Sequence, residues 1–239
     1  MKHTLIFIDT ETTGAGYDDR LIQVGYRTTD GTDVNELYSP GRKIEIGAMA
    51  VHHITEKMIT DKPAFKDSPV YKELEERFEK NHVFIAHNAP FDVSMIEREG
   101  LKVGPVIDTL KIARVLDPNG KIESYALQYL RYLLGIEVEA IAHDAWGDIL
   151  VLEQLFYRLL KKVVEETGMN QDDAVTWMIE ESKKPILYRT MRFGKYKDKH
   201  IADIANDDPG YLRWLLGQKE QEEVPDENWL YTLKHYLNI

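Results

Sequence analysis

Two carboxylates near the start of the chain, those of Asp9 and Glu11, have the spacing that metal chemistry requires. They follow the apolar run 5–8, Leu-Ile-Phe-Ile, which is typical of a buried strand that opens into a polar turn. On an extended chain residues i and i+2 point to the same face, so their Cα atoms are expected about 6.6 Å apart. Two carboxylates this close repel each other unless a cation lies between them, and Mg²⁺ prefers such oxygen ligands. The pair alone is also consistent with a solvated acidic turn.

Two further acidic residues and one histidine extend this pattern. Asp92 follows a second apolar run at 83–86, and Asp148 lies five positions after His143, where a long amphipathic segment begins. Residues five apart on a regular helix point about 140° away from each other. His143 and Asp148 can therefore converge only if His143 precedes the helix and Asp148 lies in its first turn, where the helix dipole favours a carboxylate.

Taken together, three segments resemble the DEDDh exonuclease family, the RNase T and DnaQ-like proofreading group. They are 9–14 (Asp-Thr-Glu-Thr-Thr-Gly), 87–92 (His-Asn-Ala-Pro-Phe-Asp) and 143–148 (His-Asp-Ala-Trp-Gly-Asp). The resemblance implies an RNase H-like fold and a site for two Mg²⁺ or Mn²⁺ ions, which together activate water and stabilise the leaving oxygen.

The roles of single residues are likewise implied by this resemblance. The implied metal ligands are Asp9, Glu11, Asp92 and Asp148. His143 is the implied general base, a role that suits a neutral imidazole. The implied substrate contacts in this part of the chain are Thr12, Thr13, Gly14, His87 and Asn88.

The elements expected around these residues form an α/β fold. Runs at 5–8, 21–28 and 34–38 are rich in β-branched and aromatic residues and are separated by turn signals, which predicts a three-strand meander. After the meander, short strands alternate with amphipathic helices, of which the pattern at 145–166 is the longest. We therefore expect a mixed central sheet flanked by helices, with a small α-rich C-terminal appendage.

The chain is expected to contain a catalytic domain at 1–168, a connecting helix or linker at 169–184 and a small C-terminal domain at 185–239. The last part resembles the C-terminal segment of the exonuclease X group. Phe193 and Tyr196 interleave there with Lys195, Lys197, Lys199 and two arginines, a combination that stacks on bases while following phosphates. The alternative is that the aromatic residues Phe193, Tyr211 and Trp214 form the core of a small folding unit with Leu215, and that the lysines are merely solvated.

Composition limits the remaining possibilities. The 239-residue chain contains no cysteine, which excludes disulfides and thiol catalysis. No signal peptide is visible, and no apolar stretch approaches the ~20 residues that span a bilayer. We therefore expect a cytoplasmic protein that does not associate with a membrane. A formal net charge of −11 opposes phosphate binding through Lys and Arg alone. Metal ions would supply positive charge locally, and we expect weak affinity and distributive action.

The function that the sequence favours is a metal-dependent 3′→5′ exodeoxyribonuclease. It would release 5′-mononucleotides from the 3′ ends of single-stranded or duplex DNA, in DNA repair or degradation. Two alternatives stay open: an RNA-trimming or oligonucleotide-degrading exoribonuclease with the same site, and a non-catalytic nucleic-acid-binding module. The exonuclease X-like tail favours a free-standing enzyme without an obligatory polymerase partner, whereas the oligomeric state stays undetermined.

Overall fold

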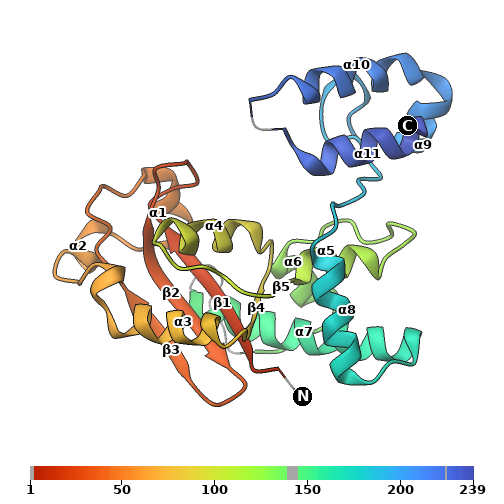
Figure 1. The fold of residues 1–239 in the computed structure, drawn as a ribbon. Helices are drawn as coiled ribbons and strands as arrows, with labels where there is room; N and C mark the ends of the chain where they lie inside the picture. The colour runs from red at the N-terminus through yellow and green to blue at the C-terminus, as the bar shows by residue number, and fades with distance from the viewer. Residues whose placement is uncertain (1–2, 139–144, 224) are drawn as a thin grey trace. The chain divides into compact units, whose positions relative to one another are not determined.

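The structure is a computed structural model that describes residues 3–138, 145–223 and 225–239. Its contacts divide the chain into a first unit, Met1–Ser182, and a second unit, Lys183–Ile239 (Figure 1). Each unit has a hydrophobic core of its own.

A five-stranded mixed sheet forms the centre of the first unit. Its strands, in the spatial order β3-β2-β1-β4-β5, are β3 (Asp33–Leu37), β2 (Leu21–Thr28), β1 (Leu5–Thr12), β4 (Val83–Ala86) and β5 (Val106–Asp108). Strands β1, β2 and β3 pair antiparallel as a meander, whereas β4 and β5 join β1 in parallel. The predicted α/β fold with a mixed sheet is confirmed.

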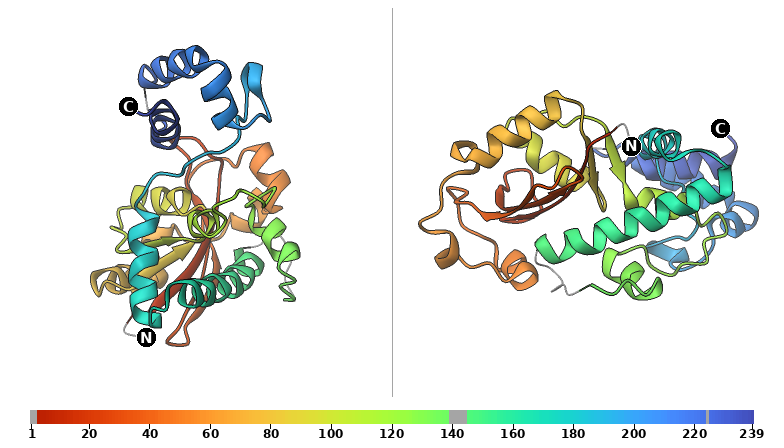
Figure 2. Two further views of the ribbon diagram at one scale, coloured as in Figure 1. Left: turned by 90° about the vertical axis from the view of Figure 1, so that its right-hand side faces the viewer. Right: turned by 90° about the horizontal axis from the view of Figure 1, so that it is seen from below.

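Helices cover both faces of this sheet, which explains why the first strand is apolar on both sides. Leu5 and Phe7 pack into a core that also contains side chains of α7 (Ala145–Thr167). The alternating residues Ile6 and Ile8 belong to the opposite core, beneath the helices α3 (Pro69–Glu79) and α4 (Pro90–Arg98). Figure 2 shows α3 and α7 on opposite sides of the sheet.

Further helices complete the first unit. They are α1 (Ile46–His52), α2 (Glu56–Ile59), the 3₁₀ turn η1 (Phe65–Asp67), α5 (Thr109–Val115), α6 (Leu127–Leu133) and α8 (Gln171–Ser182). The last of these packs against α7 and β5 and contributes Ala174 and Met178 to the core. The segment expected as a connecting helix at 169–184 therefore contains a helix that is built into the first unit.

The second unit is a small helical cluster. Its helices are α9 (Ile201–Asp207), α10 (Pro209–Glu220) and α11 (Glu227–Leu237), and η2 (Gly194–Tyr196) is a 3₁₀ turn. Met191, Leu212, Trp229 and Leu233 are buried between them. Within the described part of the chain, none of the helices is both long and apolar enough to cross a membrane.

One glycine lets α7 lie close to the sheet. Gly25 is the β2 partner of Asp9 in β1. A Cβ atom at Gly25 would lie 2.7 Å from Ile149 Cδ1 and 3.2 Å from Ala145 Cβ, both on α7. Because directly opposed residues share a face of an antiparallel pair, the missing side chain makes room for the start of α7 over the face that carries Asp9.

Replacing this glycine tests the close approach. Gly25→Ala is expected to lower the free energy of unfolding by about 1–3 kcal/mol, because the added methyl group overpacks the contact between helix and sheet. Urea denaturation measures the change. The matched control is Gly47→Ala in α1, where an added Cβ meets nothing within 4 Å. Equal stabilities of the two variants would contradict the tight contact.

Candidate active site

The first two predicted metal ligands lie inside a strand. Strand β1 runs on to Thr12, so Asp9 and Glu11 do not lie in a polar turn after it, as the sequence suggested. The strand continues because β2 still pairs with β1 opposite Thr10, and because Thr10 and Thr12 are buried. Asp9 and Glu11 alternate with these threonines on the opposite face and are half-buried. Their side chains therefore share one face, as predicted.

A third predicted ligand, Asp148, lies in the first turn of α7. Ala145 and Ile149 lie against Gly25, the partner of Asp9, and so they bring this turn over the face of β1 that carries the two carboxylates. Asp148 lies in this turn and is 9% exposed. Its Oδ1 accepts a hydrogen bond of 2.5 Å from Gln128 Nε2 of α6, which restricts its orientation.

Asp92 approaches the same strand from its other edge. Strand β4 pairs with β1 only opposite residues 5–7, so β4 leaves the edge of β1 open from Ile8 onward. Asp92, in the first turn of α4, reaches this open edge. Its Oδ1 accepts hydrogen bonds from Thr10 N at 3.1 Å and from Thr10 Oγ1 at 2.7 Å. Asp92 is thereby fixed to the residue between Asp9 and Glu11.

The burial of Asp92 has an electrostatic consequence. Loss of water raises its pKa to about 7, and the neighbouring charge of Asp108 acts in the same direction, although the hydrogen bonds from Thr10 oppose the change. A buried carboxylate is costly unless a positive charge compensates it. A divalent cation beside Asp92 would supply that charge and would favour the ionised form.

The donor set fits a hard divalent cation in its chemistry, because all four groups are carboxylates that reach β1 or the face above it. Within the described ranges, however, no three acidic or histidine side chains are grouped closely enough to hold an ion as they stand. Mutual repulsion of carboxylates keeps such side chains apart until a cation draws them together. His143, the predicted base, lies outside the described residues.

The turn after β1 directs its side chains into the protein. Thr12 Oγ1 donates to the Gly14 carbonyl at 2.7 Å, and Thr13 Oγ1 donates to Asp19 Oδ1 at 2.6 Å. A Cβ atom at Gly14 would lie 2.7 Å from both Asp19 Oδ2 and Glu45 Cδ. Glycine is thus favoured here by close packing and not by a left-handed backbone. Contact between this turn and a substrate stays a prediction.

His87 and Asn88 take part in a network behind Asp92. The ring nitrogens of His87 contact Thr109 Oγ1 at 2.9 Å and the Tyr125 carbonyl at 2.7 Å, and burial lowers its pKa. Asn88 is exposed, has a left-handed backbone with φ 68°, and donates its N–H to Asp108 Oδ1 at 3.0 Å. These contacts hold the loop that leads into α4, whereas substrate contact by either residue is a prediction that the structure does not test.

The comparisons with known proteins decide the family. The family model described as Exonuclease (RNase T) matches residues 6–156, the segment that contains all the carboxylates described above. The chain belongs to the exonuclease family. A second family model, Exodeoxyribonuclease X-like C-terminal, matches residues 191–220, within the second unit. The resemblance stated from the sequence is confirmed in both parts.

Individual members of this family show how far the similarity extends. Exodeoxyribonuclease 10 of Escherichia coli (strain K12) is 33% identical over 238 residues, which is 98% of each chain. The DNA polymerase III subunit epsilon of Buchnera aphidicola subsp. Acyrthosiphon pisum is 39% identical over 175 residues, 65% of this chain and 71% of the relative. Exonuclease X, solved in complex with 5′ overhanging duplex DNA, superimposes with a TM-score of 0.56 at 24% identity, over 73% of this chain and 99% of the other. This structural likeness supports the fold.

Two contributors to the exonuclease site were not found from the sequence. Thr10 anchors Asp92, and Gln128 orients Asp148. The alternation of side chains along β1 places Thr10 on the same face as the apolar Ile6 and Ile8. This pattern could have identified Thr10, because a buried hydroxyl needs a hydrogen-bond partner. Gln128 lies 20 residues before Asp148 on a different helix, and no spacing rule connects the two.

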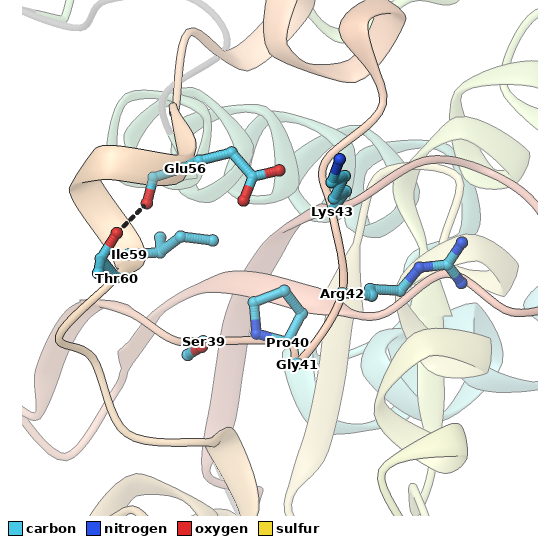
Figure 3. A pocket seen from close by; sticks show the side chains of 8 residues that line it. All are labelled: Ser39, Pro40, Gly41, Arg42, Lys43, Glu56, Ile59 and Thr60. Atoms are coloured by element: carbon cyan, nitrogen blue, oxygen red, sulfur yellow. Dashed lines mark hydrogen bonds between the residues drawn. The ribbon is translucent and has the colours of Figure 1, made fainter.

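A separate hollow of about 330 Å³ lies beside the turn after β1 (Figure 3). Arg42 and Lys43 line one side, and Glu56 and Ile59 of α2, with Thr60 directly after it, line the other. None of its lining residues is a predicted site residue. Two residues after Lys43, the N–H of Glu45 donates to the Thr13 carbonyl at 2.8 Å.

The buried state of Asp92 gives a prediction about stability and pH. Its folded-state pKa, about 7, lies above the ordinary aspartate value of 3.8, so the folded state binds the proton more tightly than the unfolded state. The stability that this proton provides is present at low pH and is lost as pH rises toward 7. In EDTA near about pH 8, the free energy of unfolding of Asp92→Asn should therefore exceed that of the unsubstituted protein by up to about 4 kcal/mol. Near about pH 5 the difference should be smaller. Urea denaturation at the two pH values measures both.

The control for this experiment is Asp18→Asn, an acid-to-amide change at an exposed position nearby. It should leave the pH profile unchanged. The pKa of Asp92 would not be raised if the free energies of unfolding of Asp92→Asn and the unsubstituted protein differed by the same amount at both pH values.

Proposed function

We propose that this member of the exonuclease family is a metal-dependent 3′→5′ exodeoxyribonuclease that releases 5′-mononucleotides from DNA. One observation carries the proposal. Three separate elements carry Asp9, Glu11, Asp92 and Asp148 toward the same end of β1, although carboxylates that approach one another repel. A cluster that costs stability and fits a cation is expected to serve chemistry.

In the proposed reaction the four carboxylates would hold two Mg²⁺ or Mn²⁺ ions. When bound, these ions supply an activated water and neutralise charge on the scissile phosphate. Gln128 and Thr10 position the carboxylates of Asp148 and Asp92 through the hydrogen bonds described above. His143 would accept the proton of the attacking water, a role assigned from the family motif.

DNA is the proposed substrate because the relative that aligns with 98% of this chain carries the name exodeoxyribonuclease. A structural neighbour of the first unit was solved with duplex DNA. The acidic surface favours rapid release after each cut, and we propose distributive action. An exoribonuclease would use the same four carboxylates, so labelled DNA and RNA of one sequence need to be compared side by side.

Neutralising two shared ligands tests the site. Asp9→Asn and Asp148→Asn should each abolish release of mononucleotides from 3′-ends in Mg²⁺, because each removes charge that holds the ions. Gel analysis of 5′-labelled DNA and RNA measures activity, direction and substrate together. Asp18→Asn is the matched control and should retain full activity.

The same assay contains three outcomes that would refute the proposal. Full activity in EDTA would show that no metal is needed. If the 5′ label appeared as a free mononucleotide among the first products, the enzyme would start from the 5′ end. Cleavage of RNA alone would assign the exoribonuclease function instead.

His143→Ala should lower turnover by about 10²–10⁴-fold while Mn²⁺ affinity, measured by calorimetry, changes little, because a general base moves a proton and does not hold the ion. His53→Ala, at an exposed histidine of the same unit, serves as the control. Loss of Mn²⁺ binding in His143→Ala would make this residue a metal ligand.

A further inference from the structure

The second unit has a strong separation of charge along the chain. Residues 183–199 contain seven basic residues and one acidic residue, a net charge of +6. Residues 200–239 contain three basic and eight acidic residues, a net charge of −5. In a chain with a net charge of −11, so many cations within one short segment form a local attraction for an anion.

The structure arranges the middle of this basic segment as a reversal of the chain. Met191 N donates to the Lys199 carbonyl at 2.8 Å, Asp198 N donates to the Met191 carbonyl at 2.7 Å, and Ile201 N donates to the Arg189 carbonyl at 2.8 Å. The tip of the reversal, residues 192–198, is therefore held by main-chain bonds on both sides. We call residues 189–201 the basic hairpin.

Contacts with the helices hold the tip of the basic hairpin in place. Gly194 has a left-handed backbone with a φ of 70°, which favours glycine. A Cβ atom there would also lie 2.6 Å from the Tyr211 hydroxyl, which is a second reason for glycine. The Tyr196 hydroxyl donates to Asp208 Oδ2 at 2.7 Å. The cations of the tip are thus presented by a fixed backbone, which reduces the entropy lost on binding.

The lysines of the basic hairpin differ in their availability. Lys195 Nζ lies 3.3 Å from Asp208 Oδ2 and is partly neutralised. Lys197 and Lys199 are exposed, and neither has an ion pair or a side-chain hydrogen bond within the part of the chain that the structure describes. These two lysines are therefore the strongest candidates for an external anion.

An exposed tryptophan lies at the end of a series of aromatic rings that starts in the hairpin. The ring of Tyr196 packs edge-on against that of Tyr211, with 4.9 Å between the ring centroids. The ring centroids of Tyr211 and Trp214 are 5.6 Å apart. Trp214 is 57% exposed, although burial of so large an apolar ring would stabilise the unit. Phe193, which the sequence suggested for stacking, instead packs edge-on against the buried Trp229 at 5.0 Å.

We propose that Lys197, Lys199 and Trp214 form a binding surface for single-stranded nucleic acid, outside the catalytic residues. The two lysines would contact successive phosphates, and the exposed indole would stack on an unpaired base. A duplex offers phosphates but keeps its bases stacked, and an acidic polypeptide offers charge but no base. The combination of free cations with an exposed ring therefore favours a single strand.

The test measures binding by the full chain in EDTA, without turnover, so that it stands whether or not the proposed exonuclease activity is found. Fluorescence anisotropy with an oligothymidylate of about 30 nucleotides is recorded over a range of salt concentrations. Lys197→Gln/Lys199→Gln should weaken binding and reduce the slope of log K against log salt by about 1.4, or about 0.7 per phosphate contact. Trp214→Ala should weaken binding about 5- to 150-fold with little change of slope.

Two matched controls isolate the surface. Lys72→Gln/Lys102→Gln makes the same charge change at exposed positions of the first unit. Tyr231→Ala removes an aromatic ring of α11 that is 43% exposed. Neither control should alter affinity or salt slope by as much as its counterpart.

Three results would overturn the proposal. The first is unchanged affinity and slope in the lysine variant, whose exposed positions leave folding intact. The second is equal weakening by the control variants, which would reflect net charge alone. The third is competition by polyglutamate as effective as by oligothymidylate, which would assign the surface to an acidic protein.

Discussion

The contact between the start of α7 and Gly25 of β2 is the constraint on which the rest of the site depends. Strand β1 can place two carboxylates on one face by alternation alone, but it cannot supply a ligand from above that face. The absence of a side chain at Gly25 lets Ala145 and Ile149 approach the sheet opposite Asp9. This approach brings the first turn of α7, with Asp148, over the strand. A larger residue would move the helix and the carboxylate together.

A second constraint acts at the opposite edge of the strand. Because β4 pairs with β1 only at 5–7, the N–H of Thr10 is not used by the sheet and is bonded to Asp92 instead. The incomplete pairing of β4 with β1 costs hydrogen bonds of the sheet. The free edge binds the carboxylate of Asp92, whose burial is a second cost. The two cores on either side of β1 offset these costs, since they bury apolar side chains of both strands and helices.

The strongly periodic parts of the fold could be predicted from the sequence. The meander and the long helix after residue 145 have clear patterns of period two and 3.6, and the four carboxylates stand in recognisable motifs. The helices α1 and α2 were not predicted, because they are 7 and 4 residues long and pack on a small cluster around Ile22 and Ile54. Helices so short depend on tertiary contacts more than on local preference.

The details of the site depend on contacts between residues far apart in the chain. The role of Gln128 follows from the approach of α6 to α7, and that of Thr10 from the end of pairing with β4. Gly14 was predicted as a substrate contact, and its close packing against Asp19 and Glu45 is a feature that sequence spacing does not reveal. In the second unit Trp214 is 57% exposed, whereas Phe193, which is 36% exposed, packs against the buried Trp229, a contact that the sequence does not reveal.

Whether the carboxylates of β1, α4 and α7 share metal ions is the central claim, and anomalous diffraction from crystals grown with Mn²⁺ tests it most directly. We predict two anomalous peaks about 3.5–4 Å apart, the spacing of two-metal sites, with Asp9 in contact with both and Asp148 with one. Peaks at other positions, or no peak within reach of Asp9 in crystals that bind Mn²⁺ elsewhere, would contradict the account.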